Sequence, residues 1–182
     1  NDLRGAEGEA SRAYFGVVTH MIRADRNHFY MAGRNRRPPR DPMNSVLSFL
    51  YALLRGECEA ALEGVGLDPQ IGYLHALRPG RPALALDLME ELRPVLADRL
   101  ALTLVNRRQL QPQHFEGKGA ISLTDEGRKL VLTAYQHRKE GEVQHRLLKQ
   151  KVPLGLVPHL QARLLARYLR GDLEVYPPYI YR

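Results

Sequence analysis

The sequence predicts an all-α fold, a compact multi-helix domain with one small β-hairpin near residues 114–123. Apolar residues recur at the three-and-four spacing of a helix face over most of the chain. Proline and glycine stand between these periodic segments, where helices begin and end. Among the 182 residues, 44% are hydrophobic and 26% are charged, a globular composition that excludes disordered and collagen-like proteins.

The first helix is expected over residues 3–21, followed by a basic loop over residues 23–40. The residues that should form the buried face of this helix are Leu3, Ala6, Ala10, Tyr14, Val17 and Met21. The periodicity ends after residue 22, where six arginines and two prolines accompany one acid, Asp25. This composition indicates an irregular, positively charged segment.

A second helix is expected to begin after Asp41, which suits the N-cap, with Pro42 in the first turn. It should continue to about Val65 and end at Gly66. Its buried stripe is expected to be Met43, Leu47, Leu50, Leu54, Cys58, Ala61 and Val65. Because Cys58 lies on this stripe without a CxxC partner, it is expected to be a core residue, and the chain to occupy a reducing, cytoplasmic compartment.

Residues 68–80 are expected to form a short helix with His75 in its last turn. A long helix should follow over residues 83–108, with a kink at Pro94 beside Glu90 because proline cannot donate to the preceding turn. Helices are then expected over the ranges 124–138, 142–151 and 159–170, after the hairpin at 114–123. The closing Tyr176-Pro177-Pro178-Tyr179 should be extended.

The charge of the chain points to a polyanionic partner. The 27 basic and 20 acidic residues give a net charge of +7 and a pI near 9.7. Arginine outnumbers lysine by 22 to 5, and its planar fork matches a phosphate, although a GC-rich genome would also favour arginine. No segment approaches the roughly 20 apolar residues of a membrane helix, and no signal peptide opens the chain, so no membrane partner is expected. The absence of an initial Met suggests a fragment.

Two sets of side chains could carry chemistry. Glu7 lies on the predicted apolar stripe of the first helix, and a buried carboxylate must be ion-paired, protonated or metal-bound. Asp87, Glu90 and Glu91 lie at i, i+3 and i+4, so Asp87 can share a helix face with either glutamate. Taken singly, Glu7 and His75 are more often structural residues, and the three acids at 87, 90 and 91 could form a solvated face. Taken together, one histidine with carboxylates suits Mn²⁺ or Mg²⁺ better than zinc.

The order and spacing of several motifs resemble the CRISPR-associated endonuclease and integrase family of spacer acquisition, over essentially the whole chain. The motifs are Arg4-Gly5-Ala6-Glu7-Gly8 with Tyr14-Phe15, Asp41-Pro42-Met43-Asn44, Gly66-Leu67-Asp68-Pro69-Gln70-Ile71-Gly72-Tyr73-Leu74-His75, and Gly80-Arg81-Pro82 leading to Asp87-Leu88-Met89-Glu90-Glu91-Leu92-Arg93-Pro94. Later matches are Gly127-Arg128-Lys129, His145, Gln161-Ala162-Arg163 and the closing Tyr-Pro-Pro-Tyr.

This resemblance implies a helical catalytic domain over residues 1–182, with a metal-site part at 1–108 and C-terminal helices and tail at 109–182. It implies that Glu7, His75 and Glu90 bind Mn²⁺ or Mg²⁺, with Asp87 in support as a fourth catalytic residue that orients His75. The β-rich domain that precedes this part in the family has no counterpart in the sequence, so activity of the lobe alone is uncertain.

The implied reaction is metal-dependent joining of foreign DNA 3′-ends into a CRISPR array by phosphodiester transesterification. The implied partners are foreign double-stranded and branched DNA, the CRISPR repeat, a second copy of the full-length protein, and a small ferredoxin-like adaptation subunit. Candidate DNA-backbone contacts are Arg34, Arg36, Arg37, Arg40, Arg78, Arg81, Arg138, Lys139, Arg146 and Lys149.

Two other interpretations remain open from the residues alone. The chain could be a non-catalytic basic helical DNA-binding module, in which Glu7 and His75 are core residues. It could also be an interaction subunit that uses its extended C-terminal segment, 176–181, for docking.

Overall fold

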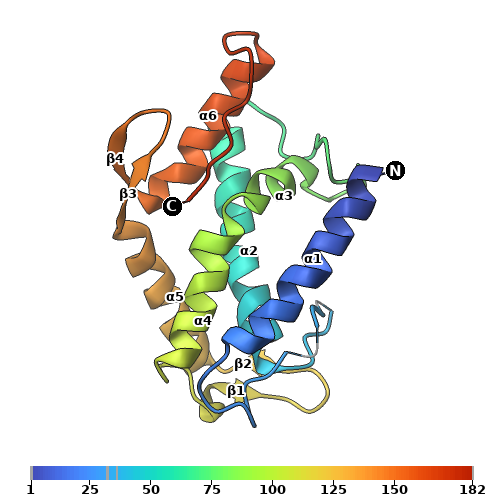
Figure 1. The fold of residues 1–182 in the computed structure, drawn as a ribbon, viewed down its shortest axis with the longest axis vertical. Helices are drawn as coiled ribbons and strands as arrows, with labels where there is room; N and C mark the ends of the chain where they lie inside the picture. The colour runs from blue at the N-terminus through green and yellow to red at the C-terminus, as the bar shows by residue number, and fades with distance from the viewer. Residues whose placement is uncertain (1, 32, 36, 182) are drawn as a thin grey trace. The chain divides into compact units, whose positions relative to one another are not determined.

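The computed structural model describes residues 2–31, 33–35 and 37–181 (Figure 1). The α-helices in this part are α1 Asp2–Met21, α2 Pro42–Glu63, α3 Ala83–Glu90, α4 Arg99–Asn106, α5 Asp125–Glu140 and α6 Val157–Leu169. The strands are β1 Phe115–Glu116, β2 Ser122–Leu123, β3 Glu142–His145 and β4 Gln150–Pro153. The predicted all-α class with a hairpin near 114–123 is confirmed. In the described residues no helix is both long enough and apolar enough to traverse a bilayer.

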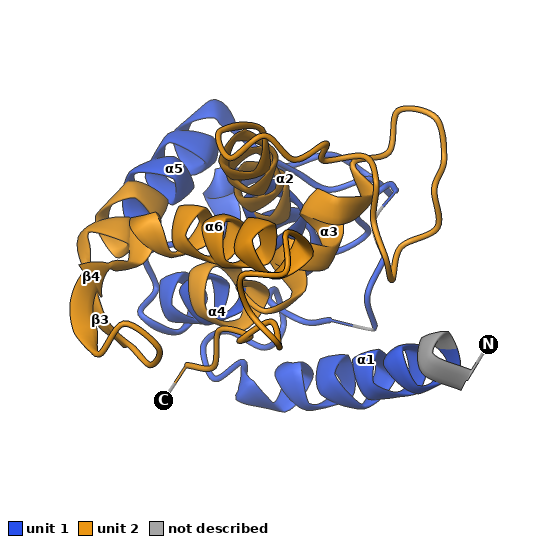
Figure 2. Ribbon diagram, turned by 90° about the horizontal axis from the view of Figure 1, so that it is seen from above, with its two compact units in different colours: residues 1–50, 98–134 blue, residues 51–97, 135–182 orange. Residues whose placement is uncertain are grey.

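The chain groups into two compact units, each made of two separate stretches (Figure 2). Unit 1 comprises Asn1–Leu50 and Asp98–Ala134, and unit 2 comprises Tyr51–Ala97 and Tyr135–Arg182. Helices α2 and α5 each begin in unit 1 and end in unit 2. The sequence predicted one domain with a metal-site part at 1–108 and C-terminal helices and tail at 109–182, and this organisation stays a prediction.

Helix α1 has the predicted extent, but its buried face is not the predicted one. Phe15, Val18 and Ile22 are 7%, 2% and 1% exposed. Tyr14 and Val17, on the predicted stripe, are 40% and 58% exposed, so that prediction is wrong. Two apolar stripes lie side by side on this helix, and the one that contains Phe15 is the stripe that packs.

Polar contacts within unit 1 attach α1 to the 98–106 segment. The Tyr14 hydroxyl donates to Asp98 Oδ2 at 2.6 Å. At the C-terminal end of α1, the Asn106 side chain donates to the Met21 carbonyl at 2.9 Å and accepts from the Arg23 backbone N–H at 2.7 Å. Burial and the neighbouring Asp98 raise the pKa of Tyr14, which keeps this hydroxyl a donor at neutral pH.

The start of α2 and the basic loop share one hydrogen-bonded network. Asp41 caps the helix as predicted, because its Oδ1 accepts from the Asn44 backbone N–H at 2.8 Å. The Asn44 amide donates to Asp41 Oδ2 at 2.7 Å and to the Gly33 carbonyl at 2.9 Å. Asn44 Oδ1 accepts from the Arg34 guanidinium at 2.7 Å. The loop is therefore irregular, as predicted, yet anchored to a buried asparagine.

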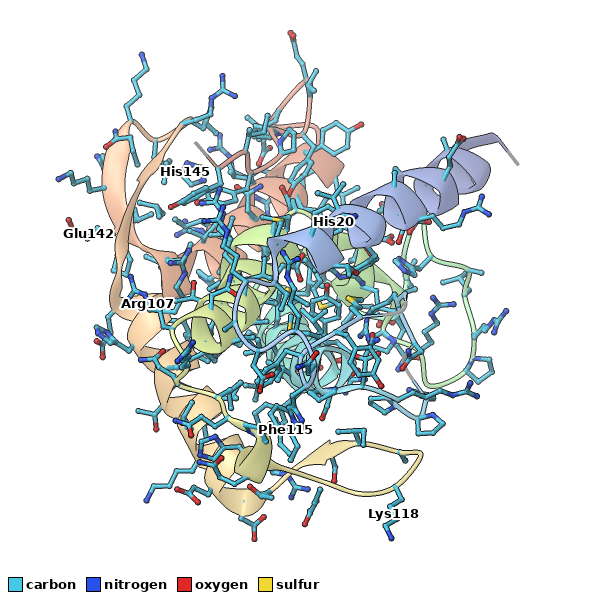
Figure 3. The ribbon with its side chains drawn as sticks, turned by 60° about the horizontal axis from the view of Figure 1, so that its bottom comes forward. His20, Arg107, Phe115, Lys118, Glu142 and His145 are labelled. Carbon is cyan, nitrogen blue, oxygen red and sulfur yellow. The ribbon has the colours of Figure 1, made fainter. Side chains whose placement is uncertain are left out.

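The predicted hairpin is formed by β1 and β2, which pair antiparallel with Phe115 opposite Leu123. Gly117 has a φ of +106°, and a Cβ there would lie 2.1 Å from the Ala120 carbonyl oxygen, so the turn requires glycine. Lys118 lies at the tip and points away from the ribbon (Figure 3).

Residues 68–80 of unit 2 do not form the predicted helix; turns and bends occupy this segment (Figure 2). Asp68 Oδ1 accepts from the Gln70 backbone N–H at 2.9 Å, which favours a turn over a helix at this proline-containing start. The backbone N–H groups of residues 73–75 are bound by a carboxylate from α3 instead of by a helical turn.

Residues 142–151, also predicted helical, form the β3–β4 hairpin. Val143 pairs with Val152, and the Leu154 backbone N–H donates to the Gly141 carbonyl at 2.7 Å. The β-branched pair favours extended backbone, and the apparent helical periodicity of this short segment was a coincidence of spacing. The hairpin carries Arg146 and Lys149 in its turn, where both are exposed.

The core of unit 2 includes Cys58, which is fully buried as predicted; burial raises the pKa of its thiol. The predicted single helix over residues 83–108 is interrupted near its predicted kink: α3 ends at Glu90, and the π-helical segment η1 Pro94–Asp98 precedes α4. Helix α6 lies close to its predicted range.

The C-terminal segment packs on its own unit through Glu91. The carboxylate accepts from the Tyr176 hydroxyl, the Tyr179 backbone N–H and, at 3.2 Å, the Gln161 amide. Tyr179 is 7% exposed. The expectation that 176–181 is a free docking segment is therefore wrong for Tyr176 and Tyr179.

We predict that Asp41→Ala lowers the free energy of unfolding by about 2 kcal/mol, because the helix loses its cap and buried Asn44 loses an acceptor. Urea unfolding measures this change. The matched Asp172→Ala removes an exposed ion pair with Arg170 and should cost less than about 0.5 kcal/mol. Equal losses in the two variants would contradict the assigned role of Asp41.

Glu91 should give the stability of the protein a distinctive pH dependence. Burial raises its pKa, and the hydrogen bonds that it accepts offset only part of this rise. Above the ordinary value of about 4.3, up to the raised value, the folded state holds more protons than the unfolded state. Stability should therefore fall as the pH rises through this window.

Glu91→Gln, which stays neutral, should lack this component. The wild type should lose stability relative to Glu91→Gln as the pH is raised from about 4, measured by urea unfolding. Glu63→Gln, at an exposed position of α2, is the control, and its free energy of unfolding should change with pH in parallel with that of the wild type. If the free energy of unfolding of Glu91→Gln changed with pH in parallel with that of the wild type, the pKa of Glu91 would not be raised.

Candidate metal centre

The carboxylate of Asp87 holds the loop that carries His75. Its Oδ2 accepts from the backbone N–H groups of Tyr73 at 2.6 Å and Leu74 at 3.0 Å. Its Oδ1 accepts from the His75 backbone N–H at 3.0 Å and lies 2.6 Å from His75 Nδ1. Gly72 permits this approach, because a Cβ there would lie 2.8 Å from Asp87 Oδ2. The predicted contact between Asp87 and His75 is confirmed.

The second ring nitrogen of His75 faces Glu90. With Nδ1 against an ionised carboxylate, the ring proton belongs on Nδ1, which leaves Nε2 with a lone pair in the neutral ring. Nε2 lies 3.9 Å from Glu90 Oε1. Asp87 and Glu90 are three residues apart on α3, so the helix presents both toward the same loop. The side chains of His75 and Asp87 are only 11% and 14% exposed.

Arg93 is a member of this cluster that the sequence analysis did not identify. Its guanidinium donates to Glu90 Oε2 at 2.8 Å, with its carbon 5.0 Å from the centre of the Tyr51 ring. The arginine therefore orients one carboxylate oxygen of Glu90 while the other faces His75. The i, i+3 spacing of Glu90 and Arg93 was the available signal.

Glu91 belongs to a different environment from Asp87 and Glu90. It is turned by about 100° from Glu90 around the helix axis, and it binds the C-terminal segment. Its acceptor capacity is used by protein donors, so it is a structural residue of unit 2. The structure thus separates Glu91 from the candidate metal centre, and the assignment of Asp87 and Glu90 to metal binding and catalysis stays a prediction.

Glu7 lies on α1 in unit 1, and its side chain is exposed, so the expectation that it is buried on an apolar stripe is wrong. The physical reason is that α1 packs through the stripe of Phe15 instead. Glu7 forms no ion pair with any cation whose side chain the structure describes. Its assignment as a metal ligand stays a prediction.

The donor set of His75 and Glu90 fits a hard or borderline divalent ion. Two ligands at about 2.1 Å from one ion can lie up to about 4.2 Å apart, so 3.9 Å between Nε2 and Oε1 is compatible with a shared ion. Magnesium-like ions commonly keep several waters and use one or two carboxylates. In the described part of the chain, no three His, Cys, Asp or Glu side chains form a complete metal cluster.

The basic residues predicted to contact DNA divide into exposed and engaged groups. The exposed ones are Arg37, Arg40, Arg78, Arg146 and Lys149, and Arg81 is half-buried. Arg36 lies outside the described residues.

Three of these predicted contacts are engaged within the protein. Arg34 donates to Asn44 and Ser48, Arg138 donates to the Val95 carbonyl at 3.3 Å, and Lys139 forms an ion pair with Glu57. Their contribution to DNA binding stays a prediction. Because each already binds an acceptor within the protein, less of their positive charge is available to DNA than the sequence suggested.

Comparison with known proteins identifies the family. Residues 1–137 match the family described as CRISPR associated protein Cas1. A CRISPR-associated endonuclease Cas1 from Moorella thermoacetica is 61% identical over 182 residues, which cover 99% of this chain and 53% of that protein. The chain thus spans about half the length of the curated relatives it matches.

Solved structures agree. A Cas1 protein from Thermotoga maritima superposes with a TM-score of 0.83 at 32% identity, over 92% of this chain and 51% of that one. A chain of a complex named Cas6-RT-Cas1–Cas2 superposes with a TM-score of 0.82 at 27% identity, over 97% of this chain and 19% of that one. The chain therefore belongs to the CRISPR-associated protein Cas1 family.

Proposed function

We propose that the protein of which this chain forms part is a metal-dependent DNA endonuclease and integrase that joins foreign DNA 3′-ends into a CRISPR array. The observation that carries the proposal is the arrangement of His75, Asp87 and Glu90, in which a histidine ring is oriented so that its second nitrogen faces a carboxylate. Family membership supports it, because curated relatives are named endonucleases. The net charge of +7 supports a polyanionic substrate.

In this proposal His75 Nε2 and the carboxylates of Glu90 and Glu7 hold one divalent ion, Mn²⁺ or Mg²⁺. When bound, such an ion polarises the scissile phosphate and helps to deprotonate the attacking hydroxyl. Asp87 keeps the proton of His75 on Nδ1, and Arg93 orients Glu90. Glu7 enters through the family resemblance alone.

The chemical step is a direct transesterification. The 3′-oxygen of incoming DNA forms a new bond to phosphorus at the repeat boundary, and the bond from that phosphorus to the old 3′-oxygen breaks. The attacking hydroxyl loses its proton, and the leaving 3′-oxygen gains one. Because the attack on phosphorus is direct, no covalent enzyme intermediate is required. The exposed Arg37, Arg40, Arg78, Arg146 and Lys149 would contact the DNA backbone.

The partners of this reaction are foreign double-stranded and branched DNA and the CRISPR repeat. We propose that the full-length protein acts as a homodimer with a small ferredoxin-like subunit; a structural neighbour is named as part of a Cas1–Cas2 complex, which supports a partner of the Cas2 type. A single, buried thiol at Cys58 fits the reducing cytoplasm that we propose as its compartment.

A non-catalytic basic DNA-binding module is the second candidate. The exposure of Glu7 on α1 favours it, because an exposed carboxylate on a helix surface is commonly a solvated residue without a ligand role. Metal binding separates the two candidates.

We predict that saturating Mn²⁺ raises the melting temperature of the chain and that Glu7→Ala and His75→Ala abolish this rise. At a free concentration of 100 times the Kd, binding stabilises the fold by about 2.7 kcal/mol, which a thermal shift detects. Equal shifts in the wild type and both variants would remove the metal assignment.

Asp87→Asn, which disturbs the orientation of His75, should weaken Mn²⁺ binding by about 10- to 100-fold in a titration. Asp68→Asn changes a carboxylate on the same loop that contacts only a turn N–H group, and it should leave the affinity unchanged.

We predict that Glu90→Gln in the full-length protein lowers metal-dependent cleavage of branched DNA by at least about 100-fold, the scale of losing one charge-stabilising group. DNA binding should remain salt-sensitive and equal or stronger, because a negative charge near the phosphate is lost. Glu59→Gln, which removes an acid paired with Arg55 on α2, is the control. Parallel loss of cleavage and binding would point away from a metal ligand.

A further inference from the structure

One face of α6 carries a row of basic side chains that is separate from the candidate metal centre. His159, Arg163, Arg167 and Arg170 follow one another at spacings of four, four and three residues, so they share a face. They line a pocket of about 330 Å³ together with Gly64 and Val65, which follow the end of α2. None of the residues that line this pocket is acidic. We call it the α6 groove.

The charges of the α6 groove are poorly compensated within the protein. Arg163 and Arg167 are exposed, and neither forms an ion pair with a described residue. Arg170 pairs with Asp172 at 3.1 Å, outside the lining. Like charges four residues apart on a helix repel each other. A bound anion would remove this repulsion.

A structural role in capping α2 does not account for these arginines. The Ala60 and Glu63 carbonyls at the end of α2 already accept from the backbone N–H groups of Gly64 and Gly66, at 2.9 and 3.0 Å. The Leu62 carbonyl accepts from Val65 and Leu67 at 3.1 and 3.0 Å. Three of the last four carbonyls of α2 are therefore bound by the backbone of the same chain, so capping these three groups does not require the guanidinium groups of α6.

We propose that the α6 groove binds the phosphate backbone of a nucleic acid strand. The seven helical steps from Arg163 to Arg170 rise by about 10 Å along the helix axis, which equals about three phosphate spacings of one strand at about 3.4 Å each. A row of this length suits a polymer better than a single anion. The guanidinium groups match the shape of a phosphate. The lining offers only Val65 and Ala166 as apolar side chains, so we expect contact with the nucleic acid backbone and no recognition of bases.

The inference rests on the proposed function only in choosing nucleic acid among polyanions. The test uses the full 182-residue chain in EDTA, so that metal binding has no part in it. Anisotropy of a short fluorescein-labelled DNA duplex of arbitrary sequence is measured at several NaCl concentrations. For Arg163→Gln/Arg167→Gln, the slope of log Kd against log [NaCl] should fall by about 2.

The control Arg55→Gln/Arg128→Gln changes the net charge equally, but it removes arginines that already pair with Glu59 and Asp125 on their own helices. Its slope should equal that of the wild type. The α6 variant should melt no lower than the wild type, because a repelling pair is removed.

An unchanged slope in the α6 variant, or an equal fall in the control, would overturn the proposal. Polyglutamate is also tested as a competitor of the duplex. If Arg163→Gln/Arg167→Gln weakens polyglutamate binding more than it weakens duplex binding, the groove is assigned to an acidic protein instead. A reduced slope for the α6 variant of the chain in EDTA, together with no metal-dependent cleavage by the full-length protein, would retain the groove while rejecting the endonuclease proposal.

Discussion

The carboxylate of Asp87 is the constraint on which the candidate site depends. It binds three consecutive backbone N–H groups and the ring of His75, so one side chain of α3 fixes both the path of the preceding loop and the orientation of a histidine. Burying a carboxylate with this many donors is favourable only when all of them are in place. The loop has no helical hydrogen bonds of its own to replace them. The geometry at His75 therefore follows from a tertiary interaction.

The acids at positions 87 and 90 of α3 and the acid at its C-cap, position 91, have different partners, because Glu91 is turned away from the face that Asp87 and Glu90 share. Asp87 and Glu90, three residues apart, share a face and address the same histidine. Glu91 is directed to Tyr176 and Gln161 and fixes the C-terminal segment. Arg93, three residues beyond the end of α3 at Glu90, completes the cluster just before the π-helical segment η1 begins at Pro94. The break in the helix therefore lies directly beside the candidate metal centre.

Local signals predicted the local features. The Asp41 cap, the hairpin at Gly117 and the interruption at Pro94 each depend on one or two residues and their neighbours, and all three were predicted. Residues 68–80 and 142–151 were mispredicted because distant or cross-strand partners decide them: Asp87 for the first, the pairing of Val143 with Val152 for the second. The buried face of α1 was misjudged because two adjacent stripes are apolar. In the site, His75, Asp87 and Glu90 could be found from residue type and motif, whereas the roles of Arg93 and Glu91 required coordinates.

We propose that His75 Nε2, oriented by Asp87, shares a divalent ion with Glu90. Anomalous scattering from a Mn²⁺-soaked crystal of the chain measures this directly. The account predicts a peak about 2.0–2.3 Å from both His75 Nε2 and a carboxylate oxygen of Glu90. A manganese ion bound elsewhere, with no peak beside His75, would contradict it.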